Sequence, residues 1–532
     1  MADKQSYGVD ITANCRPENA RDEDRQGDTD GPLGEHQSNR NFSKKSFFAW
    51  FDSNDGPLER RVILKLDFFI LTYAFVGFWV CSQSSSALSG LGFLLTITKD
   101  FVHRQRHTYQ CVHQWYARRQ DLELFGNELV QLGSIFSVGY CVYVVFIPFY
   151  KSLLCGILIA TLLVTKYPAQ YVIPTSMTIW GVFTLLCYRA NSFAELAGYR
   201  FLVGFLEGGF LGYRGDELVR RAGIFYVSSG VGTMTTGLLS SRIYQSLDGA
   251  LGHPGWRWMY IVASIMTFPI AAWGAITFPG TPRDGKRWYF TDEEFAMAKQ
   301  RMILEGRFDP KGLSLSWLSV KRFLGRWHFW VLVPWNVMWL MGYESMVTGS
   351  PTLWLRSNEQ YSVAQVNNFT AISPSIGILF ILGFSWTIDK GGQKAIAPLI
   401  GSVSLLHFIS KFAWIVYDHT SFGFKWFAVA ISYIEVSLSP INYSLANLAC
   451  AGDAEERAFV VSSMLAISTA FGTWVPIVAF PTVEAPRFFR GYVMEAVMQV
   501  TYFSWTCFVV WYSARDRRRK QNAEGPTGDS ST

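Results

Sequence analysis

Residues 129–149 read LVQLGSIFSVGYCVYVVFIPF, a stretch without one charged side chain. Its length is close to the roughly 20 apolar residues that an α-helix needs to cross the hydrocarbon core of a bilayer. The apolar residues are continuous rather than alternating, and in lipid only helices and closed barrels satisfy every backbone polar group. The stretch therefore predicts a membrane-spanning helix, and similar blocks occur along the whole chain.

The composition also favours a membrane protein. Half of the 532 residues are hydrophobic, and only 17% are charged, whereas soluble domains carry about 25%. The eight cysteines form no CxxC pair, so we expect neither a disulfide framework nor a metal site. No Gly-rich phosphate loop, HExxH or GxSxG motif occurs, so we expect no enzyme activity, no catalytic residue and no cofactor. Nothing in the chain is specific for nucleic acid.

Twelve apolar blocks can be placed, six on each side of a polar segment. They cover residues 62–80, 129–149, 171–188, 193–213, 222–239, 259–278, 329–349, 370–388, 397–417, 426–448, 459–480 and 492–512. Six spans, a long loop and six further spans are the layout of the major facilitator fold. We therefore predict an all-α membrane protein with this fold, with twelve transmembrane helices in two six-helix bundles.

Five parts of the chain follow from this layout. Residues 1–58 are polar and lack the apolar core of a signal peptide, so they predict a disordered cytoplasmic tail. The first bundle is expected at 59–279, with an atypical polar insert at 81–120 that we do not expect to pack compactly. A middle loop is expected at 280–326, the second bundle at 327–513, and a second disordered tail at 514–532. In the loop, Thr291 and Glu294 have the spacing of a capping box that opens a short helix.

Positive charge predicts the orientation. Basic residues cluster before the first block, in the middle loop and after the last block. The positive-inside rule makes these three segments cytoplasmic. We expect a monomer in the plasma membrane, with both termini in the cytoplasm and protons and a small organic anion as its partners.

Arg200 and Glu207 are the leading candidates for a transport site. They are seven residues apart, so on a helix they share a face about 10 Å apart along its axis. The planar guanidinium of Arg200 can bind two carboxylate oxygens of a substrate. Burial disfavours the charged form of a carboxyl group, so Glu207 can take up and release a coupled proton. The alternative is an ion pair that only stabilises the bundle.

A second group of candidates lies in the second half of the chain. Glu435 falls inside an apolar block, where ionisable groups are costly, and is a further candidate for proton coupling. Four polar and aromatic residues recur at helical spacing in the seventh block: Trp335, Asn336, Trp339 and Tyr343. They are candidates for the wall of a substrate-binding cavity. The alternative is that they pack between helices or form an aromatic belt at the membrane interface. After the eighth block, glycines permit a tight turn beside charged groups, which predicts a gating motif made of Asp389, Lys390, Gly392 and Lys394.

At these residues the chain resembles a known family. Arg200-Phe-Leu-Val-Gly204-Phe-Leu-Glu207-Gly-Gly resembles the fourth-span signature of the anion:cation symporters. The branch of fungal allantoate, pantothenate and vitamin permeases is similar in four further strings, KLDFFILTYAF from Lys65, DELVRRAGIFYVSSGVGT from Asp216, GWRWMYI from Gly255 and FPGTP from Phe278. The resemblance implies proton-driven import of a small carboxylate such as pantothenate, nicotinate or allantoate, with Arg200 and Glu207 in binding and coupling.

Three regions depart from the family pattern, at residues 81–120, 150–160 and 211–214. The peptide CVHQWYARR from Cys111 can be encoded so that a shift of one base reads AYISGMQE, which resembles the loop that the family has here. Three alternatives to import therefore stay open: export of a metabolite or a drug by the same fold, a transport-defective splice or gene-model variant, and a non-transporting sensor.

The topology can be tested with single cysteines at Ser43, Ser314 and Ser530. We expect all three to resist a membrane-impermeant maleimide in intact cells and to react after permeabilisation, because each lies in a basic, cytoplasmic segment. Reaction of one site but not of the others in intact cells would contradict the twelve-span count.

Overall fold

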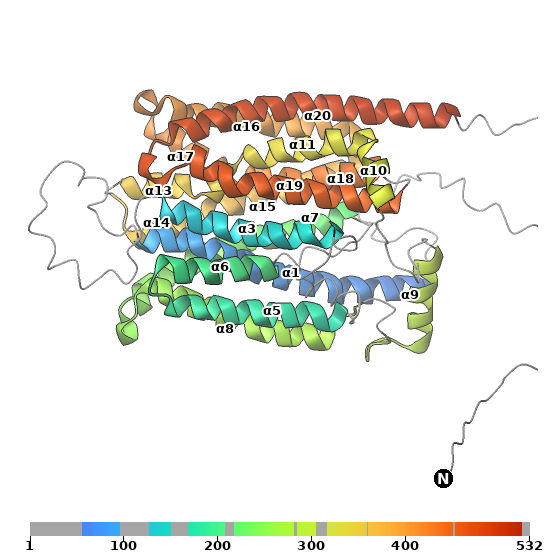
Figure 1. Ribbon diagram of the computed structural model, residues 1–532, viewed down its shortest axis with the longest axis horizontal. Helices are drawn as coiled ribbons and strands as arrows, with labels where there is room; N and C mark the ends of the chain where they lie inside the picture. Colours follow the sequence, from blue (N-terminus) through green and yellow to red (C-terminus); the bar gives the residue numbers. More distant parts are fainter. Residues whose placement is uncertain are drawn as a thin grey trace, which may run out of the picture. The chain divides into compact units, whose positions relative to one another are not determined.

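The computed structural model describes residues 56–95, 127–149, 169–207, 218–280, 285–304, 317–358, 360–450 and 453–523. Every regular element in these ranges is a helix, and the long helices run side by side (Figure 1). The described residues belong to one compact unit, whereas the N-terminal tail predicted at 1–58 lies almost entirely outside them.

Helices occupy all twelve predicted blocks. In the first half they are α1 (Pro57–Leu95), α3 (Glu128–Phe149), α5 (Ala169–Leu186), α6 (Phe193–Glu207), α7 (Leu218–Leu247) and α8 (Gly255–Thr277). The middle loop contributes α9 (Asp292–Leu304) and α10 (Trp317–Leu324). The second half contains α11 (Trp327–Met341), α12 (Glu344–Val347), α13 (Ser350–Ser357), α14 (Val363–Phe369), α15 (Ile372–Gly391), α16 (Ile396–Ile415), α17 (Phe422–Ile431), α18 (Ser439–Ala449), α19 (Ala454–Ala479) and α20 (Phe489–Ala523).

Seven helical stretches of the described residues are long and apolar enough to cross a membrane. They belong to α1, α5, α8, α14 with α15, α16, α19 and α20, and the apolar stretch of α3 is somewhat shorter. The protein is therefore an all-helical, multi-pass membrane protein. The count of twelve spans remains a prediction.

Two predicted spans are broken. The seventh block divides into α11 and α12, and α13 follows it after Gly349, which lies in the left-handed region at a φ of 73°, a conformation that glycine adopts at no steric cost. The tenth block divides into α17, a 3₁₀ segment η7 (Ile434–Leu438) and α18. Apolar periodicity does not reveal such breaks, because the side chains stay apolar across them.

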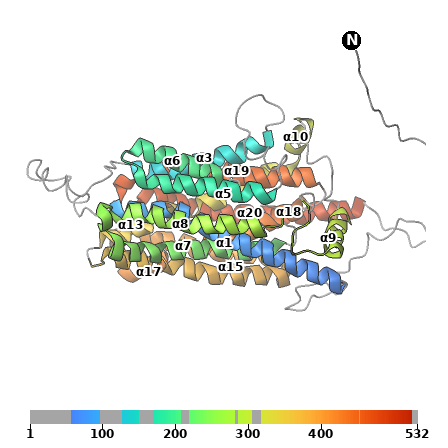
Figure 2. The same cartoon turned by 90° about the horizontal axis from the view of Figure 1, so that it is seen from below.

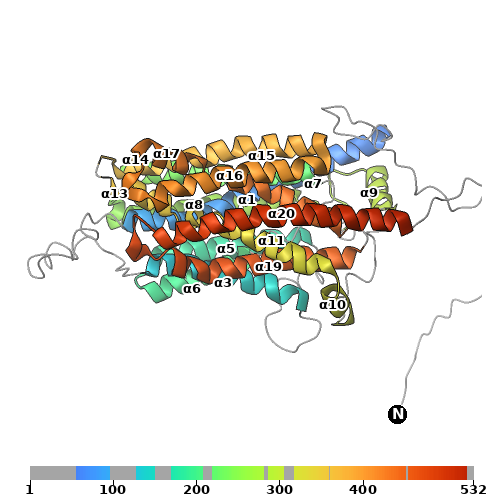
Figure 3. The same ribbon diagram turned by 90° about the horizontal axis from the view of Figure 1, so that it is seen from above.

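The two halves of the chain meet chiefly at α3 and α7. α3 packs against α19, and α7 packs against α15 and also against α14 and α18; Figures 2 and 3 show α3 beside α19 and α7 beside α15 from two further directions. Small residues permit the close approach: a Cβ added at Gly230 of α7 would lie 2.8 Å from Ile378 of α15.

Glycines also decide the contact between α3 and α6. A Cβ added at Gly139 would lie 2.2 Å from the carbonyl oxygen of Phe201, and one added at Gly204 would lie 2.2 Å from the carbonyl oxygen of Phe136. Both obstacles are backbone atoms, which cannot rotate away. The two helices therefore touch backbone to backbone, and this contact fixes α6 in place.

The middle loop is tied to the first half by α9, which lies across the end of the long helices (Figure 1). The predicted capping box is confirmed, because Thr291 Oγ1 accepts from the Glu294 N–H and Glu294 accepts from the Thr291 N–H. Glu294 also pairs with Lys65 of α1 at 2.7 Å. It is therefore a tether and not part of a solvated helix face.

Two predicted boundaries differ from the structure. α1 continues through the start of the predicted insert at 81–120 to Leu95, and its residues Cys81, Ser82 and Gln83 are buried. Our expectation that the insert would not pack was wrong for these three residues, and residues 96–126 lie outside the described ones. α20 runs on to Ala523, because the basic residues after Ala514 are good helix formers that suit a helix C-terminus.

The glycine contact predicts an asymmetric effect within α6. Gly204→Ala should lower the free energy of unfolding by about 1–3 kcal/mol, because the methyl group forces α3 and α6 apart. Gly198→Ala is the matched control, since nothing lies within 4 Å of a Cβ there, and it should be neutral or stabilising by up to about 1 kcal/mol. Thermal unfolding in detergent measures both, and an equal loss in the two variants would contradict the contact.

The tether of α9 predicts a pH effect. Lys65 and the Thr291 backbone hold the pKa of Glu294 below its usual range. Such a carboxyl stabilises the fold above its unfolded pKa of about 4.3 and loses this contribution as the pH falls through its folded pKa. Lys65→Met should thus cost about 1 kcal/mol at neutral pH, with no difference from wild type at low pH.

The control for this effect is Lys286→Met, which removes a pair with the exposed Asp292 and should change nothing. A loss in Lys65→Met that persists unchanged at low pH would mean that the lysine stem, and not its charge, holds α9.

Candidate functional site

α6 carries both leading candidates of the first half, and both are buried. Arg200 is 1% exposed and Glu207 is 6% exposed. The guanidinium carbon of Arg200 lies 4.8 Å from the ring centroid of Phe136 in α3, and its charge acts on Tyr260 and on Cys187. The described neighbours of Arg200 thus belong to the first half of the chain.

Glu207 contacts α1. Its Oε1 accepts a hydrogen bond from the thiol of Cys81 at 2.6 Å, whereas its Oε2 has no hydrogen-bond partner among the described residues. The charge of Arg200 reaches Glu207 only from a distance. A thiol is a weak donor, so one oxygen of a buried carboxyl group is available to bind a proton or a polar ligand.

Tyrosine side chains link Glu207 to the second half. Tyr140 of α3 interacts electrostatically with Cys81, Glu207, Tyr226 of α7 and Tyr443 of α18. Tyr343, at the end of α11, interacts in the same way with Tyr226 and Tyr443. We call Tyr140, Tyr226, Tyr343 and Tyr443 the central tyrosines. The sequence did not single out the three others beside Tyr343, because isolated tyrosines among 24 carry no periodic signal.

The structure brings three predicted residues of the second half together. The indole N–H of Trp339 donates to the carbonyl oxygen of Glu435 at 3.1 Å. The ring centroids of Trp339 and Tyr343 are 5.1 Å apart. Tyr343 in turn interacts with the central tyrosines Tyr226 and Tyr443. Trp339, Tyr343 and Glu435 therefore connect the break in the tenth block to the first half of the chain.

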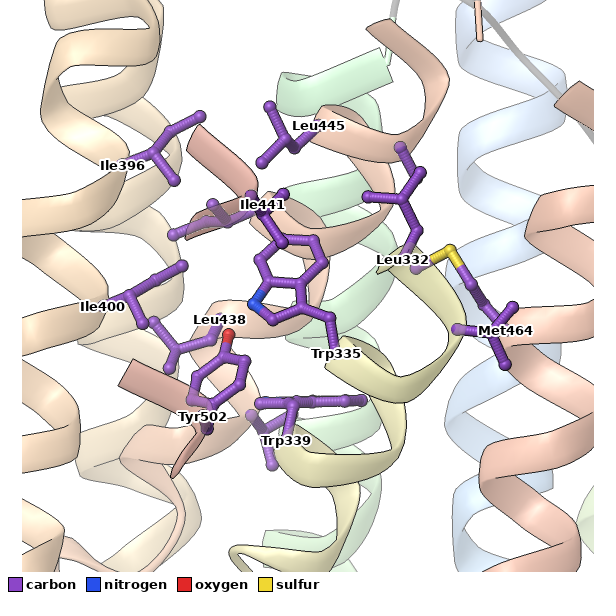
Figure 4. Packing of buried hydrophobic residues seen from close by; sticks show 14 of the residues in the cluster. Leu332, Trp335, Trp339, Ile396, Ile400, Leu438, Ile441, Leu445, Met464 and Tyr502 are labelled. Atoms are coloured by element: carbon purple, nitrogen blue, oxygen red, sulfur yellow. The ribbon is translucent and has the colours of Figure 1, made fainter. Parts of the chain in front are cut away.

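Trp335 and Asn336 point into the second half itself. Trp335 is fully buried, and its indole N–H donates to Thr506 at 2.8 Å. Figure 4 shows its ring among Ile400, Leu438, Ile441 and Tyr502. The Asn336 amide donates to Ser468 at 2.8 Å and to the Met464 carbonyl at 3.2 Å. Packing accounts for these contacts, and a role in substrate binding stays a prediction for both.

Glu435 lies in η7 and is fully buried. Its Oε2 is 3.6 Å from Nδ1 of His407 in α16. Glu435 also interacts with Gln499 of α20, and His407 interacts with the backbone of Ile431. His407 was not a candidate from the sequence, because a lone histidine in an apolar block is usually a packing residue.

The predicted gating motif lies between α15 and α16. Asp389 and Lys390 belong to the last turn of α15, and Gly392 and Lys394 to the 3₁₀ turn η5 (Gly392–Ala395) that leads into α16. The compact turn has the predicted form. A role in gating stays a prediction. In the part of the chain that the structure describes, no group of three or more His, Cys, Asp or Glu residues could hold a metal ion.

Comparisons with known proteins agree with this architecture. Residues 91–480 match the Major Facilitator Superfamily. The vitamin H transporter of Saccharomyces cerevisiae is 29% identical over 92% of this chain and 79% of its own length. The pantothenate transporter liz1 of Schizosaccharomyces pombe is 26% identical over 90% of this chain and 87% of its own.

Solved structures show the same fold at low identity. The partially occluded, inward-open xylose transporter XylE from E. coli matches with a TM-score of 0.55 and 13% identity, over 82% of this chain and 96% of that one. At this identity the match bears on the arrangement of helices alone.

Proposed function

Because the chain belongs to the Major Facilitator Superfamily, we propose that it is a secondary active transporter that imports a small organic anion together with protons. The chain is a multi-pass membrane transporter and not an enzyme. In the proposed arrangement, twelve spans cross the plasma membrane and both termini are cytoplasmic, in agreement with the distribution of basic residues.

The surroundings of Glu207 are the observation that carries the proton coupling. Its carboxyl group is buried, accepts one hydrogen bond among the described residues, from the Cys81 thiol, and interacts with Tyr140, one of the central tyrosines. Ionisable groups at such depth are retained for function more often than for stability, since burying them is costly. A proton bound at Glu207 neutralises this charge. Because Glu207 lies near the contact between the two halves, proton binding can change how the halves pack and so couple the proton to transport.

Arg200 is the proposed anchor for the substrate. Arginine keeps its charge at every working pH and offers a planar pair of donors to a carboxylate. Trp339 and Tyr343 are the proposed wall on the side of the second half, because Tyr343 interacts with Tyr226 of the first half and the Trp339 ring packs against Tyr343. Glu435 is the proposed second site for a proton, with His407 beside it.

The substrate class follows from this chemistry and from the relatives. A buried arginine favours a monocarboxylate, and the relatives are named as transporters of vitamin H and of pantothenate. The buried contacts of Cys81, Ser82 and Gln83 with α6 and α7 support a transport-competent chain rather than a defective variant. Radiolabelled biotin, pantothenate, nicotinate and allantoate, offered to a permease-deficient yeast strain, would identify the substrate.

Two substitutions separate the proposed roles. Glu207→Gln mimics the protonated acid, so it should abolish uphill, pH-driven accumulation and leave counterflow exchange of the substrate intact. Arg200→Lys keeps the charge but loses the two-pronged geometry, so the apparent affinity should fall about tenfold or more, even for exchange. Uptake and exchange are measured in parallel at several pH values.

Glu484→Gln, on a partly exposed carboxylate that pairs with Arg490, is the control and should behave as wild type. Continued accumulation against the gradient by Glu207→Gln would assign the coupling proton to another group, with Glu435 the next to be tested.

A further inference from the structure

One face of α20 is polar although the helix lies in an apolar block. Its residues recur every three or four positions, all are at most 1% exposed, and they are Tyr492, Glu495, Gln499, Tyr502 and Thr506. We call them the polar seam of α20. The C-terminal part of the seam contacts Asn442 through Tyr502 and Trp335 through Thr506. The N-terminal part, Tyr492 to Gln499, contacts the break in the seventh span.

Three seam residues hold this break. Gln499 donates to the Gly342 carbonyl at 3.1 Å, and Glu495 accepts a hydrogen bond from the Ser345 N–H. The Tyr492 hydroxyl lies 3.0 Å from Ser350 Oγ. Both ends of the segment between α11 and α13 are therefore bound to α20, which supplies the partners that a broken helix loses.

Lys411 of α16 completes the arrangement. Its ammonium lies 2.6 Å from Glu495 Oε2 and 3.4 Å from Ser345 Oγ. Both charges of the pair are at most 5% exposed. A well-packed apolar pair is often at least as stable as a buried ion pair, so such a pair is better explained by the geometry that it imposes than by stability.

The imposed geometry concerns the proposed transport site. Gly342 and Ser345 flank Tyr343, which precedes α12 and interacts with Tyr226 of α7 and Tyr443 of α18. We propose that Lys411 and Glu495 are positioning residues for transport: they hold the break in the seventh span so that Tyr343 faces the first half. The proposal rests on the proposed transport function for its kinetic consequence, but the geometry itself can be tested without a substrate.

The kinetic test uses two single variants and their combination. Glu495→Gln keeps an acceptor for the Ser345 N–H and leaves Lys411 unpaired, and Lys411→Met leaves Glu495 unpaired. Each should raise the KM for uptake about tenfold, with a smaller change in maximal rate per molecule in the membrane. In the double variant neither member of the pair keeps a charge without its partner, so it should recover most of the wild-type KM.

The control is the pair of Arg487 and Asp418, which is 2.6 Å long but more than half exposed. Arg487→Met with Asp418→Asn should leave the KM unchanged.

The substrate-independent test reads the position of α12. Val347 is half exposed. Val347→Cys is introduced into a variant in which the other accessible cysteines have been replaced by serine. Its rate of reaction with a maleimide should change several-fold in each single variant and return in the double variant. If no substrate is taken up by the wild type but the labelling follows this pattern, the proposed function fails and the positioning role stands.

Three results would overturn the positioning role. The first is wild-type KM and labelling in both single variants. The second is a double variant whose defects are the sum of the two single ones. The third is a lower amount of protein in the membrane with unchanged KM and labelling, which would make the pair merely structural.

Discussion

The hydrocarbon core of the membrane contains no partner for an unpaired backbone N–H or C=O, and each such group costs several kcal/mol there. This constraint makes every described element helical, and it also decides where helices can break. The break at Gly342–Ser350 is bonded to α20. The break before η7 is bonded to α15, where Ser373 accepts from the Tyr433 N–H at 2.8 Å. Irregular backbone is thus tolerated where a neighbouring helix supplies the missing hydrogen bonds.

The two halves use different residues to hold their helices together. In the first half, glycines at positions 139 and 204 let α3 and α6 meet at their backbones, so dispersion and close packing hold the contact. In the second half, hydroxyl, amide and charged side chains connect the helices, as the polar seam of α20 shows. The close backbone contact fixes α6 by shape, whereas directional hydrogen bonds specify one register of the helices in the second half.

The sequence predicted what depends on neighbouring residues. Helices occupy all twelve apolar blocks, and the capping box of Thr291 and Glu294 forms as expected, because both signals are local. The partner of Glu294 is Lys65, 229 positions away, and that of Glu207 is Cys81, 126 positions away. No spacing rule connects such residues. The polar seam did have a signal, a polar residue every three or four positions, but it was masked by the apolar average of the block.

The strength of the contacts indicates how such a chain can change shape. The ion pairs of the described residues lie within the second half, within the middle loop, or between the loop and one half, and three of them are 2.6 Å long. Among the described residues, hydrogen bonds that join the two halves connect neutral groups and include three longer ones: Cys141 to the Ala466 carbonyl at 3.8 Å, Tyr433 to Ser229 at 3.4 Å and Ser241 to the Ala364 carbonyl at 3.1 Å. Weak neutral bonds cost less to exchange than charged ones. A motion that rocks one half against the other therefore disturbs less free energy than one that deforms either half, which is the requirement of alternating access.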